Sequence, residues 1–187
     1  MNLEQIQEEV KKRLSEKRYH HSKCVMERCE EIARKFKYDI EVAKKVGIAH
    51  DIAKELTDEE KLEYCRKNNI EIDDMEKQSI SILHAKIGAH IVKELFGFDE
   101  KMCNAIKAHT TGLPQMDMLA KILFIADRTS KERNFPDIEN LNGLLDEGID
   151  KAVLYILDKK IELQLKKQAN IHINTVITRN EMIDKVK

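Results

Sequence analysis

The stretch Gly47-Ile48-Ala49-His50-Asp51-Ile52-Ala53-Lys54 places an imidazole and a carboxylate inside an otherwise apolar helical run. Adjacent side chains of a helix point in different directions, so His50 and Asp51 can both face one ion only near a helix end or from inside a bundle. Buried polar groups are costly unless a charged partner lies between them, and a metal ion is one such partner. By helical spacing, Lys54 shares a face with both. A solvated or internally paired His-Asp dipeptide also arises by chance, so the rest of the chain has to distinguish a metal site from such a chance pair.

The composition is typical of an all-helical chain. Its 187 residues include only six glycines and two prolines, and 36% are charged with a net charge of -1. This balance predicts no nucleic-acid partner and no membrane surface, and we expect no membrane-spanning segment. The four cysteines form no Cys-x-x-Cys pair and follow no secretory signal, which favours a reducing cytoplasm. The oligomeric state stays open, with a homodimer among the options.

Apolar residues at helical spacing predict the secondary structure of the whole chain. Residues 70–77 and 131–136 are expected to be loops. The helix over 117–129 is apolar on three sides and is expected to be the central buried one. We expect an all-α bundle in one domain over 1–187, with a core at about 18–130 and C-terminal helices at about 137–187 packing on it. The predicted helices cover 3–15, 19–36, about 40 to just after 54, 57–68, 80–96, 99–109, 117–129, 137–147, 150–167 and a final segment from 174.

Five of these predicted helices carry a candidate metal ligand. Taken alone, His21 is better explained as a solvated residue or a cap partner, and His84 as a hydrogen-bonded core histidine. His109 at a helix end could pair with the helix dipole. Asp127 differs, because it follows a run of five apolar residues where an unpaired carboxylate is costly, and its neighbour Arg128 points elsewhere on a helix. The candidates are His21, His50, Asp51, His84, His109 and Asp127.

The order of these residues along the chain, together with flanking motifs, is more specific than any one of them. The motifs are Arg18-Tyr19-His20-His21-Ser22, His109-Thr110-Thr111-Gly112 before Pro114, Arg133-Asn134-Phe135-Pro136, and Ile171-His172 with Thr175. From about residue 18 to 180 the chain resembles the HD-domain metal-dependent phosphohydrolase superfamily, and within it the YqeK family of symmetrical diadenosine tetraphosphate hydrolases. The resemblance implies an HD-domain helical bundle that converts diadenosine tetraphosphate to two ADP. The chain departs from the family at Ala85-Lys86, Arg128 and Ile173.

The ligand set indicates the chemistry. Four imidazoles and two carboxylates without a thiolate suit iron or manganese, and zinc or another divalent ion is also compatible. Six ligands are too many for one ion that keeps a position for water. The hypothesis is therefore a dinuclear centre, with iron as the expected metal, bridged by Asp51 and a hydroxide. One ion would be held by His21, His50 and Asp127, and the other by His84 and His109. Such a centre activates water for in-line attack at phosphorus.

A polyphosphate substrate needs local positive charge. Lys54, which we expect to be catalytic with Asp51, and Arg133 are the first candidates, and Arg18 is the next. The other expected nucleotide contacts are Thr110, Thr111, Gly112, His172 and Thr175. Each has a structural alternative as a solvated cation, a helix C-cap or a loop histidine. Two other functions stay open: an HD phosphohydrolase for another nucleotide, such as a mononucleotide or a guanosine polyphosphate, and a noncatalytic metal-dependent nucleotide-sensing module.

Overall fold

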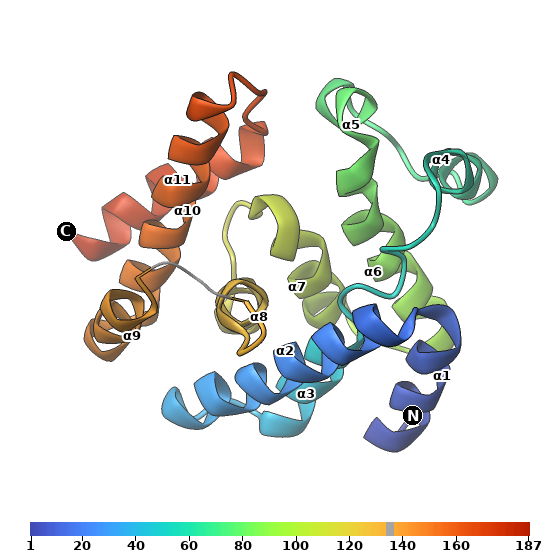
Figure 1. Cartoon of the computed structure of the whole chain (residues 1–187), viewed down its shortest axis with the longest axis horizontal. Helices are drawn as coiled ribbons and strands as arrows, with labels where there is room; N and C mark the ends of the chain where they lie inside the picture. Colours follow the sequence, from blue (N-terminus) through green and yellow to red (C-terminus); the bar gives the residue numbers. More distant parts are fainter. Residues whose placement is uncertain (134–136) are drawn as a thin grey trace.

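The computed structural model of the chain describes residues 1–133 and 137–187. Within these ranges it contains eleven α-helices, one 3-10 helix and no β-strand, so the all-α prediction is confirmed (Figure 1). No helix in the described ranges is long and apolar enough to cross a membrane. The elements are α1 (Leu3–Arg13), α2 (Glu16–Lys35), α3 (Ile40–Ala49), α4 (Asp58–Lys67), α5 (Asp74–Gln78), η1 (Ile80–Ile82), α6 (Leu83–Phe96), α7 (Glu100–Thr111), α8 (Met118–Thr129), α9 (Ile138–Glu147), α10 (Ile149–Lys166) and α11 (Ile173–Val186).

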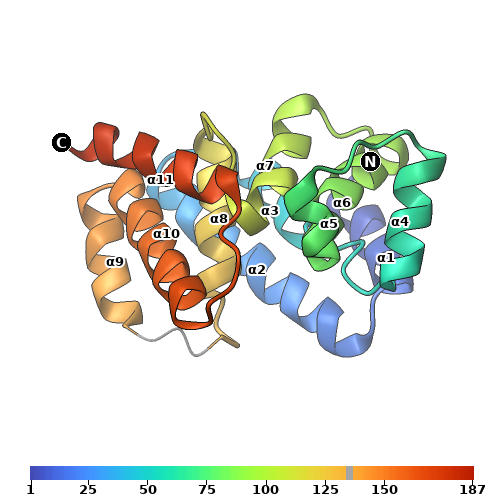
Figure 2. The same cartoon turned by 90° about the horizontal axis from the view of Figure 1, so that it is seen from above.

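The central helix is α8, as its apolar sequence predicts. Ten of its twelve residues are buried, with Phe124 among the largest fully buried side chains. It contacts α2, α3 and α7 on one side and α10 on the other, and α9, α10 and α11 lie together at the C-terminal end of the molecule (Figure 2). The division into a core at 18–130 and added C-terminal helices stays a prediction. The last three residues of the Arg133-Asn134-Phe135-Pro136 motif, and with them the end of the predicted loop at 131–136, lie outside the described residues.

Helix α3 ends earlier than its sequence predicts. It ends at Ala49, so the prediction that His50, Asp51 and Lys54 lie in its last turns was wrong. Beyond Ala49 the chain makes tight turns, in which the N–H of Ile52 donates to the Ala49 oxygen at 3.1 Å and that of Lys54 to the Asp51 oxygen at 2.8 Å. A regular helix would rotate Asp51 by about 100° relative to His50. The tight turns instead let both side chains face the same interior point.

Several other boundaries also differ from the prediction, and for two of them a capping motif is the local cause. Helix α2 begins at Glu16 instead of Tyr19 because the Ser15 hydroxyl caps it by accepting from the N–H of Arg18. Helix α7 continues to Thr111, two residues beyond His109. The predicted loop at 70–77 contains part of α5, which begins with a capping box between Asp73 and Glu76. These caps are all visible in the sequence as short polar motifs.

The close packing of α2 against α3 depends on Gly47. A Cβ at this position would lie 2.8 Å from the Met26 Cα, a backbone atom that cannot rotate aside. We expect Gly47→Ala to lower the free energy of unfolding by about 1–3 kcal/mol, measured by urea denaturation. Gly143→Ala in α9 is the matched control, because an added Cβ meets nothing within 4 Å there and alanine favours the helix. Equal unfolding midpoints for the two variants would refute this account.

Candidate metal centre

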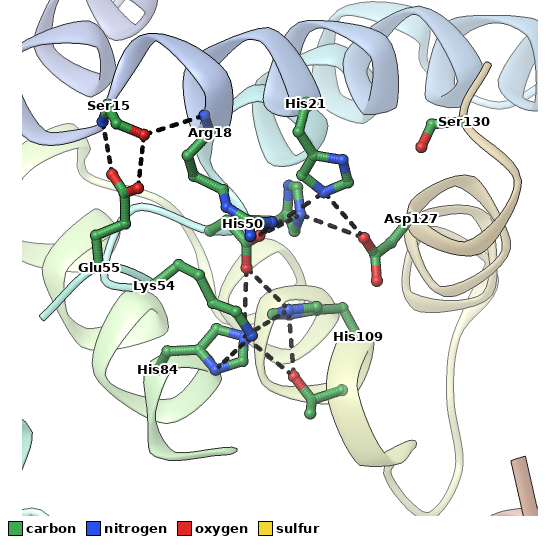
Figure 3. Close-up of polar contacts among 12 residues, drawn as sticks. Ser15, Arg18, His21, His50, Lys54, Glu55, His84, His109, Asp127 and Ser130 are labelled. Carbon is green, nitrogen blue, oxygen red and sulfur yellow. Dashed lines mark hydrogen bonds and ion pairs between the residues drawn. The ribbon is translucent and has the colours of Figure 1, made fainter. Parts of the chain in front are cut away.

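Six side chains from five segments meet in one buried cluster (Figure 3). Helices α2, α6, α7 and α8 each contribute one residue, and the turn after α3 contributes an adjacent pair. The segments are far apart in the sequence, and the packing of α2, α3 and α7 around α8 brings them together. All the ligands predicted from the sequence are present: His21, His50, Asp51, His84, His109 and Asp127.

Asp51 lies at the middle of the cluster, and its two oxygens face opposite sides. Its Oδ2 lies 3.4 Å from Nε2 of His50 and 3.7 Å from Nε2 of His21. Its Oδ1 lies 3.3 Å from Nε2 of His84 and 3.5 Å from Nε2 of His109. The ligand atoms therefore form two groups of three, His21-His50-Asp51 and Asp51-His84-His109, within which all atoms lie within 4.8 Å of one another. A carboxylate shared in this way can bridge two ions.

Asp127 adds a second carboxylate on the side of the first group. Its Oδ1 lies 3.2 Å from Nε2 of His21 and 3.6 Å from Nε2 of His50. It therefore faces the same two imidazoles as Oδ2 of Asp51. This arrangement matches the predicted division of ligands between two ions, although the binding of ions by these residues remains a prediction.

The imidazole rings are held so that Nε2 points into the cluster. A carbonyl oxygen only accepts hydrogen bonds, so a ring nitrogen that contacts one must carry the proton. The other nitrogen then offers its lone pair to a metal, as in most histidine ligands. In three cases the acceptor is the carbonyl three residues earlier: Nδ1 of His50 donates to Gly47 (2.8 Å), that of His84 to Ser81 (2.5 Å) and that of His109 to Ile106 (2.6 Å).

Burial and neighbouring charges shift the pKa values of the cluster residues in opposite directions. Burial disfavours the charged form of His50, but Asp51 and Asp127 outweigh it and raise the pKa of this imidazole to about 10. Burial also opposes ionisation of both carboxylates, yet the neighbouring imidazoles, His50 beside Asp51 and His21 beside Asp127, hold their pKa values well below the usual range. Burial lowers the pKa of His109 to about 4. The cluster therefore combines two ionised carboxylates, whose charge favours a cation at His50, with the neutral imidazole of His109.

Unpartnered atoms in the cluster test whether a metal fits. His50 Nε2 and Asp51 Oδ1 are buried and have no hydrogen-bond partner among residues 1–133 and 137–187. Nε2 of His84 and Nε2 of His109 lie 3.1 Å apart, where two lone pairs repel unless a cation or a proton lies between them. The donors are nitrogen and oxygen only, a set that suits iron, manganese or zinc. These residues fit a metal centre.

Comparison with known proteins identifies the family. Residues 18–132 match the HD domain. The chain belongs to the HD-domain family. It is 33% identical to the symmetrical bis(5'-nucleosyl)-tetraphosphatase of Halalkalibacterium halodurans and 29% identical to that of Bacillus subtilis, each over 98% of both chains. A crystal structure of a predicted HD superfamily hydrolase involved in NAD metabolism from Clostridium acetobutylicum has a TM-score of 0.93 and 34% identity, covering 99% of this chain and 98% of that one. The resemblance found in the sequence is confirmed.

Three cations border this HD-domain cluster. Arg18 Nη1 lies 3.0 Å from Asp51 Oδ2, and Arg133 Nη2 lies 2.9 Å from Asp127 Oδ1. Lys54 Nζ lies 3.3 Å from Nε2 of His84, so Lys54 lies beside the cluster as expected, although turns after α3 place it there instead of helical spacing. Burial lowers the pKa of Lys54. The structure therefore places all three predicted phosphate contacts at the HD cluster, and their role in binding stays a prediction.

The polar groups of the Thr110-Thr111-Gly112 segment point in different directions. The Thr110 hydroxyl faces the HD cluster, 3.2 Å from Nε2 of His109. By contrast, the Thr111 hydroxyl donates to the Gly112 carbonyl at 3.0 Å, and the N–H of Gly112 donates to the Ala108 oxygen at 2.8 Å. Thr110 alone of the three has its polar group directed at the metal ligands.

The two predicted contacts from the C-terminal segment lie at the start of α11. His172 caps this helix, because its Nδ1 accepts from the N–H of Asn174 at 3.2 Å. The Thr175 hydroxyl donates to the Thr111 carbonyl at 2.7 Å and so ties α11 to the end of α7. His172 and Thr175, together with Thr111, line a narrow pocket of about 70 Å³ next to the cluster.

Sequence reasoning missed Glu132, the partner of His21. Its Oε1 accepts from Nδ1 of His21 at 2.5 Å and from the Ser130 hydroxyl at 2.8 Å. Glu132 therefore holds the ring of His21, which alone of the four cluster histidines has no main-chain acceptor within residues 1–133 and 137–187. The two residues are 111 positions apart, and no periodicity or motif links them, so only the folded chain reveals the pair.

We expect Glu132→Ala to weaken metal binding by about ten- to a hundredfold, because the orienting partner of a histidine ligand is removed. The measurement is a competition titration of the metal against a chelator of known affinity. Glu27→Ala is the control, since this half-exposed glutamate pairs with Lys131 and is not one of the six residues of the cluster. An unchanged metal affinity in Glu132→Ala would show that the contact with His21 does not matter.

Proposed function

We propose that this HD-domain protein is a metal-dependent hydrolase that cleaves diadenosine tetraphosphate symmetrically into two ADP. The observation that carries the proposal is the position of Asp51, whose two oxygens face two separate groups of ligands. The names of the two bacterial relatives, both symmetrical bis(5'-nucleosyl)-tetraphosphatases, support it. When bound, a pair of divalent ions lowers the pKa of a water and polarises a phosphoryl oxygen. Iron is the proposed metal, with manganese or another divalent ion as the alternative.

In this proposal the bordering cations neutralise the tetraphosphate. Arg18 and Arg133 contact the same carboxylate oxygens that would hold the ions. Metal binding therefore competes for these oxygens and makes the guanidinium groups available to phosphate, which they bind in a planar, bidentate manner. Lys54 supplies a compact charge at the side of His84, and the Thr110 hydroxyl supplies a donor beside it. Thr111, His172 and Thr175 line the narrow pocket proposed for one ribose or phosphate, and Gly112 follows Thr111 in the chain.

The two other readings of the sequence remain as alternatives. A different nucleotide could occupy the same centre, because the ligands recognise phosphate and not the base. A noncatalytic sensing module is less favoured, since an ion that only stabilises the fold needs a single closed set of ligands. The proposal also places the protein in the cytoplasm, where its four buried cysteines stay free, without a nucleic-acid partner and with a homodimer as one assembly.

The identity of the first products tests this function. Protein loaded with iron or manganese is incubated with diadenosine tetraphosphate in ¹⁸O-labelled water, and the early products are separated by chromatography. We expect ADP alone, with label in one ADP of each pair, because water attacks one inner phosphorus and the bond to the bridging oxygen breaks. AMP together with ATP would overturn symmetrical cleavage. Turnover of a mononucleotide or a guanosine polyphosphate in preference would favour the second enzyme reading.

A further inference from the structure

A groove larger than the pocket beside His172 lies between α8 and α10. It encloses about 600 Å³, within the roughly 300–1,000 Å³ of ordinary ligand sites. Arg128 of α8 forms one wall, and Tyr155, Lys160 and Leu163 of α10 lie on the other. The pocket beside His172 encloses about 70 Å³. Of these two spaces, only the groove has the size of a whole nucleoside.

Lys160 connects the groove to the metal cluster. It lines both the groove and the narrow pocket beside His172. Its Nζ donates to the carbonyl of Thr110, whose hydroxyl lies 3.2 Å from Nε2 of His109. Burial, reinforced by the positive charge of Arg128, lowers the pKa of Lys160 to about 7. The groove thus begins one residue away from the ligands, on the side where Arg128 follows Asp127.

The lining of the groove matches a nucleotide in its chemistry. Arg128 Nε is buried and has no hydrogen-bond partner among residues 1–133 and 137–187. Lys159 of the groove pairs with Glu162 at 3.2 Å. Arg128 and Lys160 are the basic residues where the groove meets the cluster, beside Asp127 and Thr110. Farther along α10, the exposed Leu163 offers an apolar surface to a base. From the cluster outward, the groove therefore presents basic residues first and an apolar surface second, which is the order of phosphates and base in a nucleotide.

We propose that the α8–α10 groove binds the second nucleoside diphosphate half of a dinucleoside tetraphosphate, with Arg128 and Lys160 contacting its phosphates. The inference rests on the proposed function. A symmetrical substrate has two identical halves on either side of the bond that is cleaved, so they must leave the metal centre in different directions. The groove is one such direction, because Lys160 at its inner end contacts Thr110 beside the cluster.

Two tryptophan variants test the groove by filling it. Leu163 and Leu165 are both exposed on α10, at 49% and 63%, but only Leu163 lines the groove. We expect Leu163→Trp to raise KM for diadenosine tetraphosphate by at least about tenfold, the equivalent of 1.4 kcal/mol. It should leave KM for adenosine tetraphosphate, which has the same phosphate chain and one nucleoside, unchanged. Leu165→Trp should match the wild type on both substrates. The same KM in both variants would overturn the inference.

Binding of ADP separates this inference from the proposed function. In equilibrium dialysis with metal-loaded protein, we expect two ADP per wild-type chain and one per chain in Leu163→Trp. Arg128→Leu should weaken binding of the second ADP in the same way. This variant keeps the test valid if the tryptophan side chain turns out of the groove. If the wild type fails to hydrolyse diadenosine tetraphosphate but binds two ADP, the function is wrong and the groove stands as a nucleotide site. A single ADP per wild-type chain overturns the groove.

Discussion

Asp51→Asn should abolish turnover of diadenosine tetraphosphate, with a loss of at least about a thousandfold in kcat. The substitution keeps the size of the side chain but removes the charge that lies between two pairs of imidazoles. An amide nitrogen would also face one of those pairs, and its lone pair is not available to a metal ion. Both groups of ligands are damaged by this one change, so we expect the purified variant to contain little metal when measured by plasma mass spectrometry.

The matched control is Asp58→Asn. Asp58 is an exposed residue of α4 that pairs with Lys61 at 3.0 Å and touches no ligand. It should keep wild-type turnover and metal content. A folded Asp51→Asn protein, as judged by circular dichroism, that retains both its metal and its activity would remove Asp51 from the role of a bridging ligand.

Lys54→Met should lower kcat/KM by about a hundredfold, as expected for loss of one charged group that stabilises developing charge, while metal content stays normal. The ammonium group lies beside His84 without being a ligand, so its removal takes away countercharge for phosphate and leaves the metal-binding atoms in place. Lys54→Arg should not restore the rate, because a planar guanidinium does not fit the space of a compact ammonium in a half-buried position.

Lys61→Met provides the comparison for this variant. Lys61 is also buried, but it pairs with Asp58 on the surface of α4 and is not part of the cluster. Its replacement should leave kcat/KM unchanged. If Lys54→Met loses its metal along with its activity, the lysine acts by supporting His84, and the assignment to phosphate is wrong.

Local signals in the sequence predict most of the helices. Thr57 and Glu60 form the capping box that begins α4, and the apolar run of α8 places that helix at the centre. The prediction failed where long-range packing changes a local preference. The residues after Ala49 could continue a helix by propensity, but tight turns there let His50 and Asp51 face the same cluster.

The six residues of the cluster could be predicted because the family motif fixes their order along the chain, whereas a single residue such as His84 carries too little information. The contacts around them could not be predicted in the same way. Lys54 contacts a histidine 30 residues away, and Glu132 holds a ring 111 residues away. Such pairs depend on how helices cross, and neither spacing nor composition carries that information.

The way the histidines are held also determines how sequence drift can harm the centre. His50, His84 and His109 are oriented by carbonyl oxygens of the main chain, which every amino acid possesses. Side-chain replacements at the acceptor positions therefore leave these three rings with their partners. His21 depends on the carboxylate of Glu132, which one nucleotide change can delete. The histidine held by a side chain is thus the point at which a single replacement would most easily weaken metal binding in this chain while all six candidate ligands stay in place.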